Sequence, residues 1–315
     1  ADHVLQSCEA YLIQPDHSFL AETFNERVDA LTDASPEEKA AYKEQNLAVL
    51  KEHFIPAYKN LIDGITSLMG TGTNEKGLSE FPQGKEYFEY LVKSNTATSY
   101  DSVVKLQKAI EKQLNSDLKA LGEIVQTHPE LVDALDTYAF QYTKPDEILE
   151  TLKGQISKDF PALPKCSYKV KYVPKALEGS LSPAFYLVPP LDRYQDNVIY
   201  INGGTRFQNE DLFPTLAHEG YPGHLYQNVY FISNNTCDLR KILSFSSYSE
   251  GWATYVEYYS YTLDNGLDPS MGQLLAHNAA ISLGLYALLD ICINYDGWDK
   301  GQVKEYLSKF YNIGD

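Results

Sequence analysis

Residues 218–224 read HEGYPGH, and this stretch decides how the second half of the chain is interpreted. Zinc peptidases typically carry two histidines four residues apart on a helix, with a glutamate after the first, because both rings then lie on one face. Here the second histidine, His224, follows His218 by six residues. Six steps of about 100° leave the two rings roughly 240° apart on an ideal helix. An unbroken helix therefore could not use both histidines as ligands of one metal.

The residues between the histidines favour a break in the helix. Pro222 has no N–H to donate to the carbonyl of His218, and its ring clashes there. Gly223 adopts backbone angles that other residues resist. A two-residue bulge at this Pro-Gly pair would bring His224 back beside His218. The same pair could simply end a helix that carries two ordinary histidines, so the spacing alone leaves both interpretations open.

A third donor lies 26 residues beyond His224, in the helical pattern YSEGWATYVEYYS (248–260). Zinc hydrolases need about three protein ligands, an open position for water, and a base that takes the proton of that water. Two histidines and Glu250 from the next helix would supply the ligands, and Glu219 would be the base.

Both acidic residues of this helix also have structural interpretations. Ser247 and Glu250 match the Ser-x-x-Glu capping box, in which the glutamate bonds a backbone N–H at the helix start. Glu257 shares the helix face of Glu250 and could orient a histidine ligand. Alternatively, Glu257 is an exposed surface carboxylate.

Four further residues are weaker candidates for substrate contact or metal binding. Tyr221 and Tyr248 flank the proposed ligands and could contact substrate or an oxyanion, although packing is favoured in a chain with 25 tyrosines. His277 lies in the apolar helical stretch MGQLLAHNAAISLGLYALL, where a hydrogen-bonded core histidine is favoured over a ligand. Arg206 could bind a carboxylate group.

The composition is that of a folded protein, and its negative charge favours neutral or basic substrates, although such a charge more often serves only to keep a protein soluble. Of the 315 residues, 43% are hydrophobic and 22% charged, which excludes wholesale disorder. The net charge of 26 − 43 = −17 argues against nucleic acid or an anionic membrane as the main partner. No run of 18 apolar residues occurs, so we expect no membrane-spanning segment. The four cysteines are widely spaced, which favours unpaired thiols.

The pattern of apolar residues predicts a mainly α-helical protein with a small β-sheet (α+β). We expect a helical N-terminal region (1–160) and a region (161–315) with the sheet and the metal-site helices, together forming one catalytic unit. Ser35 caps a long helix that Pro56 should kink or divide. The expected helices are 35–70, 99–126, 129–141, 145–159, 212–232, 247–264, 269–293 and 299–311. The expected strands lie in CSYKVKYV (166–173), AFYLVPP (184–190) and NVIYIN (197–202).

The two motifs together carry a resemblance to a known family. LAHEGYPGHLYQ (216–227) followed by YSEGWATYVE (248–257) resembles the domain-of-unknown-function 885 family, bacterial proteins with HExxPGH and EGWAxYxE motifs. Residues 77–92 and 183–202 are also similar to that family. The resemblance implies a zincin-like metallopeptidase related to thimet oligopeptidase and thermolysin. It further implies one zinc ion held by His218, His224 and Glu250, with Glu219 as the base.

The sequence departs from the family pattern in two places. Asn294 stands where family members often have histidine, so a ligand or substrate-binding role at that position is in doubt. Family members also continue beyond Asp315 with a segment containing tyrosine and glycine, and related peptidases often supply the oxyanion-stabilising group from late in the chain. The sequence begins at Ala1, with neither an initiator methionine nor a signal-peptide pattern, so we expect a trimmed or processed chain.

These observations predict a hydrolase that cleaves peptides or small amides. Glu219 would take a proton from a zinc-activated water and later deliver it to the leaving amine. A peptide could lie antiparallel to an exposed edge strand at 184–188, unless that strand is an inner one. The alternatives are a zinc amidase with a non-peptide substrate and a non-catalytic peptide-binding scaffold that retains the metal-site residues. The family's frequent export suggests an extracytoplasmic location.

Overall fold

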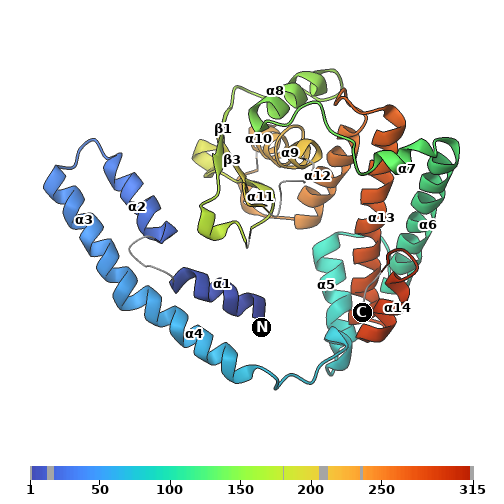
Figure 1. The fold of residues 1–315 in the computed structure, drawn as a ribbon, viewed down its shortest axis with the longest axis horizontal. Coiled ribbons are helices and arrows are strands. Elements are labelled where there is room, and N and C mark those ends of the chain that lie inside the picture. The colour runs from blue at the N-terminus through green and yellow to red at the C-terminus, as the bar shows by residue number, and fades with distance from the viewer. Residues whose placement is uncertain (1, 13–17, 180, 206–211, 235–236, 313–315) are drawn as a thin grey trace. The chain divides into compact units, whose positions relative to one another are not determined.

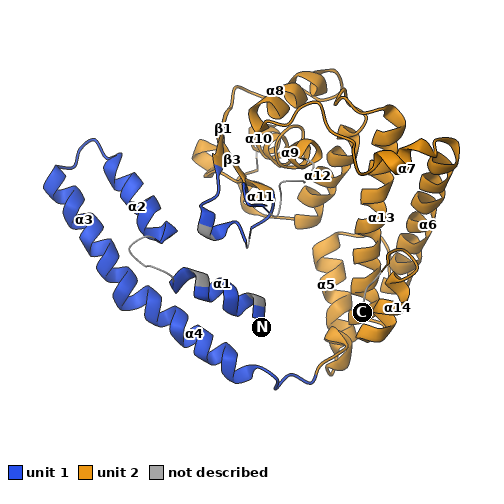
Figure 2. Ribbon diagram, in the orientation of Figure 1, with its two compact units in different colours: residues 1–73, 172–183, 202–209 blue, residues 74–171, 184–201, 210–315 orange. Residues whose placement is uncertain are grey.

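The computed structural model describes residues 2–12, 18–179, 181–205, 212–234 and 237–312 (Figure 1). The described residues form a mainly helical protein with one three-stranded sheet, as the sequence predicts. The chain divides into two compact units (Figure 2). Unit 1 comprises residues 1–73, 172–183 and 202–209, and unit 2 comprises the remainder, including every proposed metal ligand.

Unit 1 contains the helices α1 (Asp2–Leu12), α2 (Phe19–Asp29), α3 (Pro36–Val49) and α4 (Ile55–Leu68). Ser35 caps α3 as predicted, because its hydroxyl accepts the N–H of Glu38 and the Glu38 carboxylate accepts the N–H of Ser35. A π-helical segment, Leu50–Phe54, connects α3 to α4. The predicted break at Pro56 therefore takes the form of one widened turn just before the proline, which cannot continue the regular hydrogen-bond ladder.

Two long helices form one side of unit 2. They are α6 (Val103–Thr127) and α13 (Pro269–Asn294), which lie side by side (Figure 1). They share a buried cluster that includes Leu114, Leu285 and Leu288. By length and composition α13 could cross a membrane, alone among the described helices, but a core helix passes the same test. Several leucines of α13 are buried inside the protein, as in a core helix.

One predicted helix of unit 2 is much shorter than expected. Instead of 129–141, the structure contains α7 (Glu130–Ala134). Beyond it, the ring of Phe140 stacks on Phe213 with centroids 5.5 Å apart, and the N–H of Gln141 donates to the carbonyl of Asn265. These contacts with residues far along the chain replace the local helical bonds. The helix α8 (Pro145–Gln155) forms near its predicted place, with α5 (Gly84–Thr96) earlier in the chain.

The sheet contains β1 (Ser167–Tyr172), β2 (Ala184–Leu187) and β3 (Asp196–Ile201) in the order β1-β3-β2. β2 pairs with β3 antiparallel, with Tyr186 opposite Ile199. β2 is therefore an edge strand, and the alternative of an inner strand is wrong. On one face, Ala184, Tyr186 and Ile199 are buried in the main core.

The remaining helices are α9 (Leu212–Glu219), α10 (His224–Asn234), α11 (Asp238–Ile242), α12 (Ser246–Ser260) and α14 (Lys300–Leu307). Of these, α9, α10 and α12 carry the predicted site, and α9 packs against β2 of the sheet. Leu216 of α9 and Leu225 of α10 are fully buried in the same core as the sheet. α12 packs against α9, which brings the two sequence motifs together. The short α11 was not predicted.

Candidate metal centre

The helix that carries HEGYPGH is interrupted, as the Pro-Gly pair predicts. α9 ends at Glu219 and α10 begins at His224. The peptide bond between Tyr221 and Pro222 is cis. A Cβ atom on Gly223 would lie 1.7 Å from the carbonyl oxygen of His218, so the backbone passes against the end of α9 where only glycine fits. An unbroken helix through both histidines is thus excluded.

Trp252 of the second motif fixes this interruption. Its indole N–H donates to the carbonyl of Pro222 at 2.7 Å. The indole is held in turn by edge-to-face contact with Phe160 (5.9 Å) and by stacking on Tyr226 (6.5 Å). The tryptophan two residues after Glu250 therefore ties α12 to the segment that separates the histidines. This contact gives a physical reason for the two motifs to occur together.

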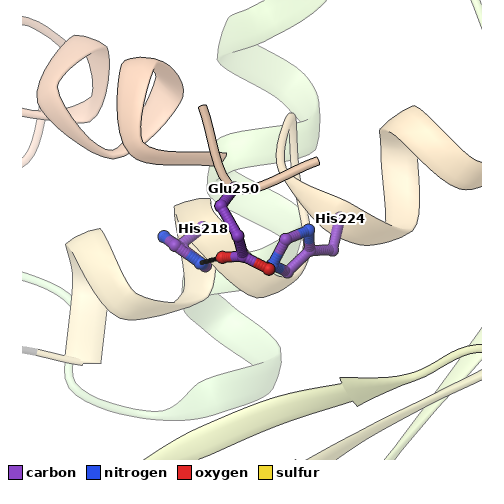
Figure 3. A group of neighbouring side chains, drawn as sticks. All are labelled: His218, His224 and Glu250. Carbon is purple, nitrogen blue, oxygen red and sulfur yellow. Dashed lines mark ion pairs between the residues drawn. The ribbon is translucent and has the colours of Figure 1, made fainter. Parts of the chain in front are cut away.

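His218, His224 and Glu250 converge from three helices (Figure 3). Glu250 Oε2 lies 3.6 Å from Nε2 of each histidine, and one donor atom from each residue falls within 4.8 Å of the others. Donor atoms of a tetrahedral zinc site are about 3.3 Å apart, so little movement separates this group from a ligand set. The histidine side chains are 20% and 17% exposed, whereas Glu250 is 60% exposed. The group is therefore open to solvent on the side of Glu250.

Glu257 orients the first histidine. Its Oε2 lies 3.0 Å from Nδ1 of His218, which leaves Nε2 of that ring facing Glu250. Carboxylate–histidine pairs of this kind fix the ring and its tautomer in metal sites. The capping-box interpretation of Glu250 is wrong, because α12 begins at Ser246 and its N-cap residue, Phe245, makes no side-chain capping bond. Glu250 therefore lies past the first turn with its carboxylate at the histidines.

Glu219 is held by the edge of the sheet. The backbone N–H of Tyr186, on β2, donates to Glu219 Oε2 at 2.7 Å. Burial raises the pKa of Glu219 above its ordinary value, opposed by this hydrogen bond and by the neighbouring His218. The carboxylate of Glu250 also acts on Glu219 electrostatically and raises the pKa further. The charges of His218 and Glu250 therefore act on Glu219, although Glu219 is not one of the three donor residues.

The two histidines differ in electrostatic environment. For His218, burial opposes protonation, but the hydrogen bond with Glu257 and the surrounding carboxylates outweigh it, and its pKa is raised. For His224, burial and the neighbouring His218 together lower the pKa, so this imidazole is neutral near pH 7. A neutral imidazole nitrogen is the form that binds a metal.

The other predicted site residues, Tyr221, Tyr248 and His277, differ in burial and in the contacts they make. Tyr221 is 2% exposed and its ring packs edge-to-face against Tyr168, so it is a core residue, as favoured from the sequence. Tyr248 is 75% exposed, so the expected packing is absent for that residue. His277 bonds through Nδ1 to Asp117 Oδ1 at 3.0 Å, which agrees with a satisfied structural histidine between α13 and α6.

Asn294 does not join the group of His218, His224 and Glu250. Asn294 Oδ1 accepts the N–H of Leu78, and its Nδ2 donates to Asp290, so both ends of the amide are engaged in holding a turn against α13. Arg206 lies outside the described residues. Trp252 and Tyr186 were not predicted to take part in the site, although they lie within the motif 248–260 and the predicted strand 184–190. The position of Trp252 in the EGW motif, two residues after Glu250, could have indicated a role in the site. The role of the Tyr186 N–H depends on strand register, which no local sequence pattern indicates.

The comparisons with known proteins support the family suggested by the motifs. The model of a family described as bacterial protein of unknown function (DUF885) matches residues 1–313. The chain belongs to this family. No curated protein matches the DUF885 chain.

One solved structure resembles it closely in fold, "the putative lipoprotein from Colwellia psychrerythraea", with a TM-score of 0.82 and 20% sequence identity. The match covers 99% of the DUF885 chain and 57% of that chain, so the DUF885 chain spans little more than half the length of this neighbour. At this identity the likeness shows the fold alone.

Proposed function

We propose that this protein is a zinc-dependent hydrolase with a zincin-like site, and that its substrates are peptides. His218, His224 and Glu250 would hold the zinc ion, and Glu219 would be the general base. The observation that carries the proposal is the convergence of three donor atoms within 4.8 Å, drawn from helices on both sides of an interruption. Chance clusters of surface acids do not explain two half-buried histidines facing one carboxylate.

The donor set fits zinc better than calcium or magnesium. Two imidazole nitrogens and one carboxylate are the ligands of thermolysin-like catalytic zinc sites, which keep a fourth position open. Ions such as calcium and magnesium prefer oxygen-only sets. The hydrogen bond between His218 and Glu257 supports metal binding, because ligating histidines usually donate their second nitrogen to such a partner. The exposure of Glu250 leaves room for water and substrate.

In the proposed reaction, one residue of the protein would transfer protons and two others would position the reacting groups. When bound, zinc lowers the pKa of a coordinated water and polarises the scissile carbonyl. Glu219 would accept the proton of the attacking water and return it to the leaving amine. The N–H of Tyr186 holds the Glu219 carboxylate at 2.7 Å and so aims it before substrate arrives. Glu257 would keep the ring of His218 in its ligating orientation.

The edge strand favours peptides over small amides as substrates. β2 has β3 on one side and carries exposed side chains at Leu187 (53%) and, just beyond it, Val188 (62%). An extended peptide can add to such an edge through backbone hydrogen bonds. The same strand bonds Glu219, so a peptide lying along it would pass the base. A non-peptide amide would make no use of this edge.

We further propose an extracytoplasmic location in bacteria. The family is bacterial, and the solved neighbour of the same fold is described as a "putative lipoprotein". Membrane fractionation of the native host with detection of the protein tests this location.

Metal analysis and two substitutions test the catalytic proposal. We expect purified protein to contain about one zinc per chain, by inductively coupled plasma mass spectrometry, and to cleave members of a set of internally quenched peptides. Glu219→Gln should keep the zinc and lose cleavage, whereas His218→Ala should lose both. Absence of zinc, with no effect of His218→Ala, would overturn the proposal. Zinc without cleavage of any peptide would favour the peptide-binding scaffold instead.

A further inference from the structure

Tyr186 is the residue at which the edge strand, the base and a metal-site helix meet. Its backbone N–H donates to Glu219. Its hydroxyl donates to Asn197 Oδ1 on β3 at 2.7 Å and accepts from Asn228 Nδ2 on α10 at 2.9 Å. One residue thus bonds the proposed base through its main chain and the helix of His224 through its side chain.

The register explains why the N–H reaches Glu219. In an antiparallel pair, residues alternate between positions that bond the partner strand and positions whose N–H and C=O face away from it. Tyr186, opposite Ile199, occupies the second kind of position, since its N–H is given to Glu219. Among the described strands β2 has a partner on one side only, so no backbone ladder fixes its position on the side of Glu219. The Tyr186 side chain is the part of this residue that enters the core.

The side-chain network is well suited to fix the strand. Tyr186 is 9% exposed and Asn197 only 2%, and Asn197 Nδ2 also donates to the carbonyl of Ser167 on β1 at 3.0 Å. Burial raises the pKa of the Tyr186 phenol, so it stays a neutral donor. Asn228 is four residues after His224 and so lies on the same face of α10. The network therefore runs through all three strands and ends on the helix that begins with a proposed ligand.

We propose that Tyr186 is a positioning residue for Glu219: its hydroxyl, bonded to Asn197 and Asn228, fixes the edge strand relative to α10 so that its N–H aims the Glu219 carboxylate. The inference rests on the proposed function for its catalytic consequence, but not for its structural content. Loss of the hydroxyl alone leaves the N–H present but removes the bonds to Asn197 and Asn228, so the strand can shift relative to α10. A displacement of about 1 Å in a catalytic group can cost on the order of 100-fold in rate.

The structural part is tested on metal-free protein by hydrogen–deuterium exchange at the residue 186 amide. In Tyr186→Phe this N–H should exchange about 10-fold or more faster than in the unaltered protein. Tyr168→Phe is the matched control, because Tyr168 lies on β1 and its hydroxyl bonds Glu150 instead. Unchanged exchange in Tyr186→Phe, or an equal increase in Tyr168→Phe, would overturn the proposal. Asn228→Ala removes one bond of the hydroxyl and should give a smaller increase if Tyr186→Phe does not fold.

The catalytic part is tested with the best-cleaved peptide of the substrate screen. Tyr186→Phe should lower kcat by about 10- to 100-fold, because the base is displaced, with KM changed less than about twofold and zinc content unchanged. A raised KM with an unaltered kcat would mean that the residue binds substrate and would contradict the positioning role. If the protein proves to hold no zinc, the exchange measurement still decides whether Tyr186 holds Glu219.

Discussion

Glu257 Oε2 lies 3.0 Å from Nδ1 of His218, on the side of the ring away from Glu250. The pair joins two helices, α9 and α12, that are far apart in sequence and carry the two motifs. The hydrogen bond fixes the ring of His218, near the end of α9, so that its Nε2 faces Glu250.

Replacing Glu257 by alanine should weaken zinc binding by about 10- to 100-fold, because His218 loses the partner that fixes its tautomer and orientation. Competition with a chromophoric chelator measures the affinity. Glu123→Ala is the control, since that glutamate is exposed on α6 and pairs with Lys119 at 3.6 Å. Equal affinities for Glu257→Ala and Glu123→Ala would show that Glu257 has no orienting role.

Gly223→Ala should abolish zinc binding and destabilise the fold. The added methyl group would lie 1.7 Å from the His218 carbonyl oxygen and 2.3 Å from that of Ala217, and neither backbone atom can withdraw without unwinding α9. Gly251→Ala is a matched control next to a ligand. A Cβ there meets nothing within 4 Å, and alanine should stabilise the helix by up to about 1 kcal/mol. Urea unfolding and zinc content distinguish the two variants; a folded, zinc-replete Gly223→Ala protein would refute the structure of this turn.

Trp252→Phe should weaken zinc binding while keeping the fold, because the Pro222 carbonyl loses its donor and the segment between the histidines is no longer fixed. We expect a loss of about 1–3 kcal/mol in unfolding free energy for the unpaired carbonyl. Trp298→Phe offers a control for the loss of ring volume, since Trp298 packs on Tyr306 on α14. If both variants bind zinc as tightly as the unaltered protein, the bond to Pro222 has no role in the site.

Zinc should raise the melting temperature of metal-free protein, because a ligand that binds only the folded state stabilises it. At a free concentration 100 times the Kd the gain is about 2.7 kcal/mol. His218→Ala and His224→Ala should each remove the zinc-dependent shift measured by differential scanning calorimetry. A shift that survives in both variants would place the bound zinc elsewhere.

The thiols should differ widely in reactivity. Cys237 is exposed, whereas Cys292 is buried and its pKa is raised by that burial to about 11. At pH 8 only about 0.1% of such a thiol is thiolate, the form that reacts. Iodoacetamide should therefore alkylate Cys237 first and leave Cys292 unmodified, as mass spectrometry can follow. All four cysteines should react in guanidinium, because none is in a disulfide.

Local patterns predicted much of the fold. Ser35, Pro36 and Glu38 specify a capping box within four residues, and the three apolar, β-branched and aromatic stretches specify strands by their own composition. The predicted helix over residues 135–141 is absent because Phe140 stacks on Phe213 instead of continuing α7. Helix propensity contributes little free energy per residue, so a tertiary contact in the core overrides it.

The sequence by itself determined that the helix must break between His218 and His224, because Pro222 and Gly223 act on the backbone within one turn. It also supplied the chemical types of the donors. Only the tertiary structure decided that Glu250 faces both rings, that Glu257 holds His218, and that Tyr186 presents its N–H to Glu219. These relations depend on the packing of α9 against α12 and on the register of β2. Packing and register are set by the whole core, so no short stretch of sequence encodes them.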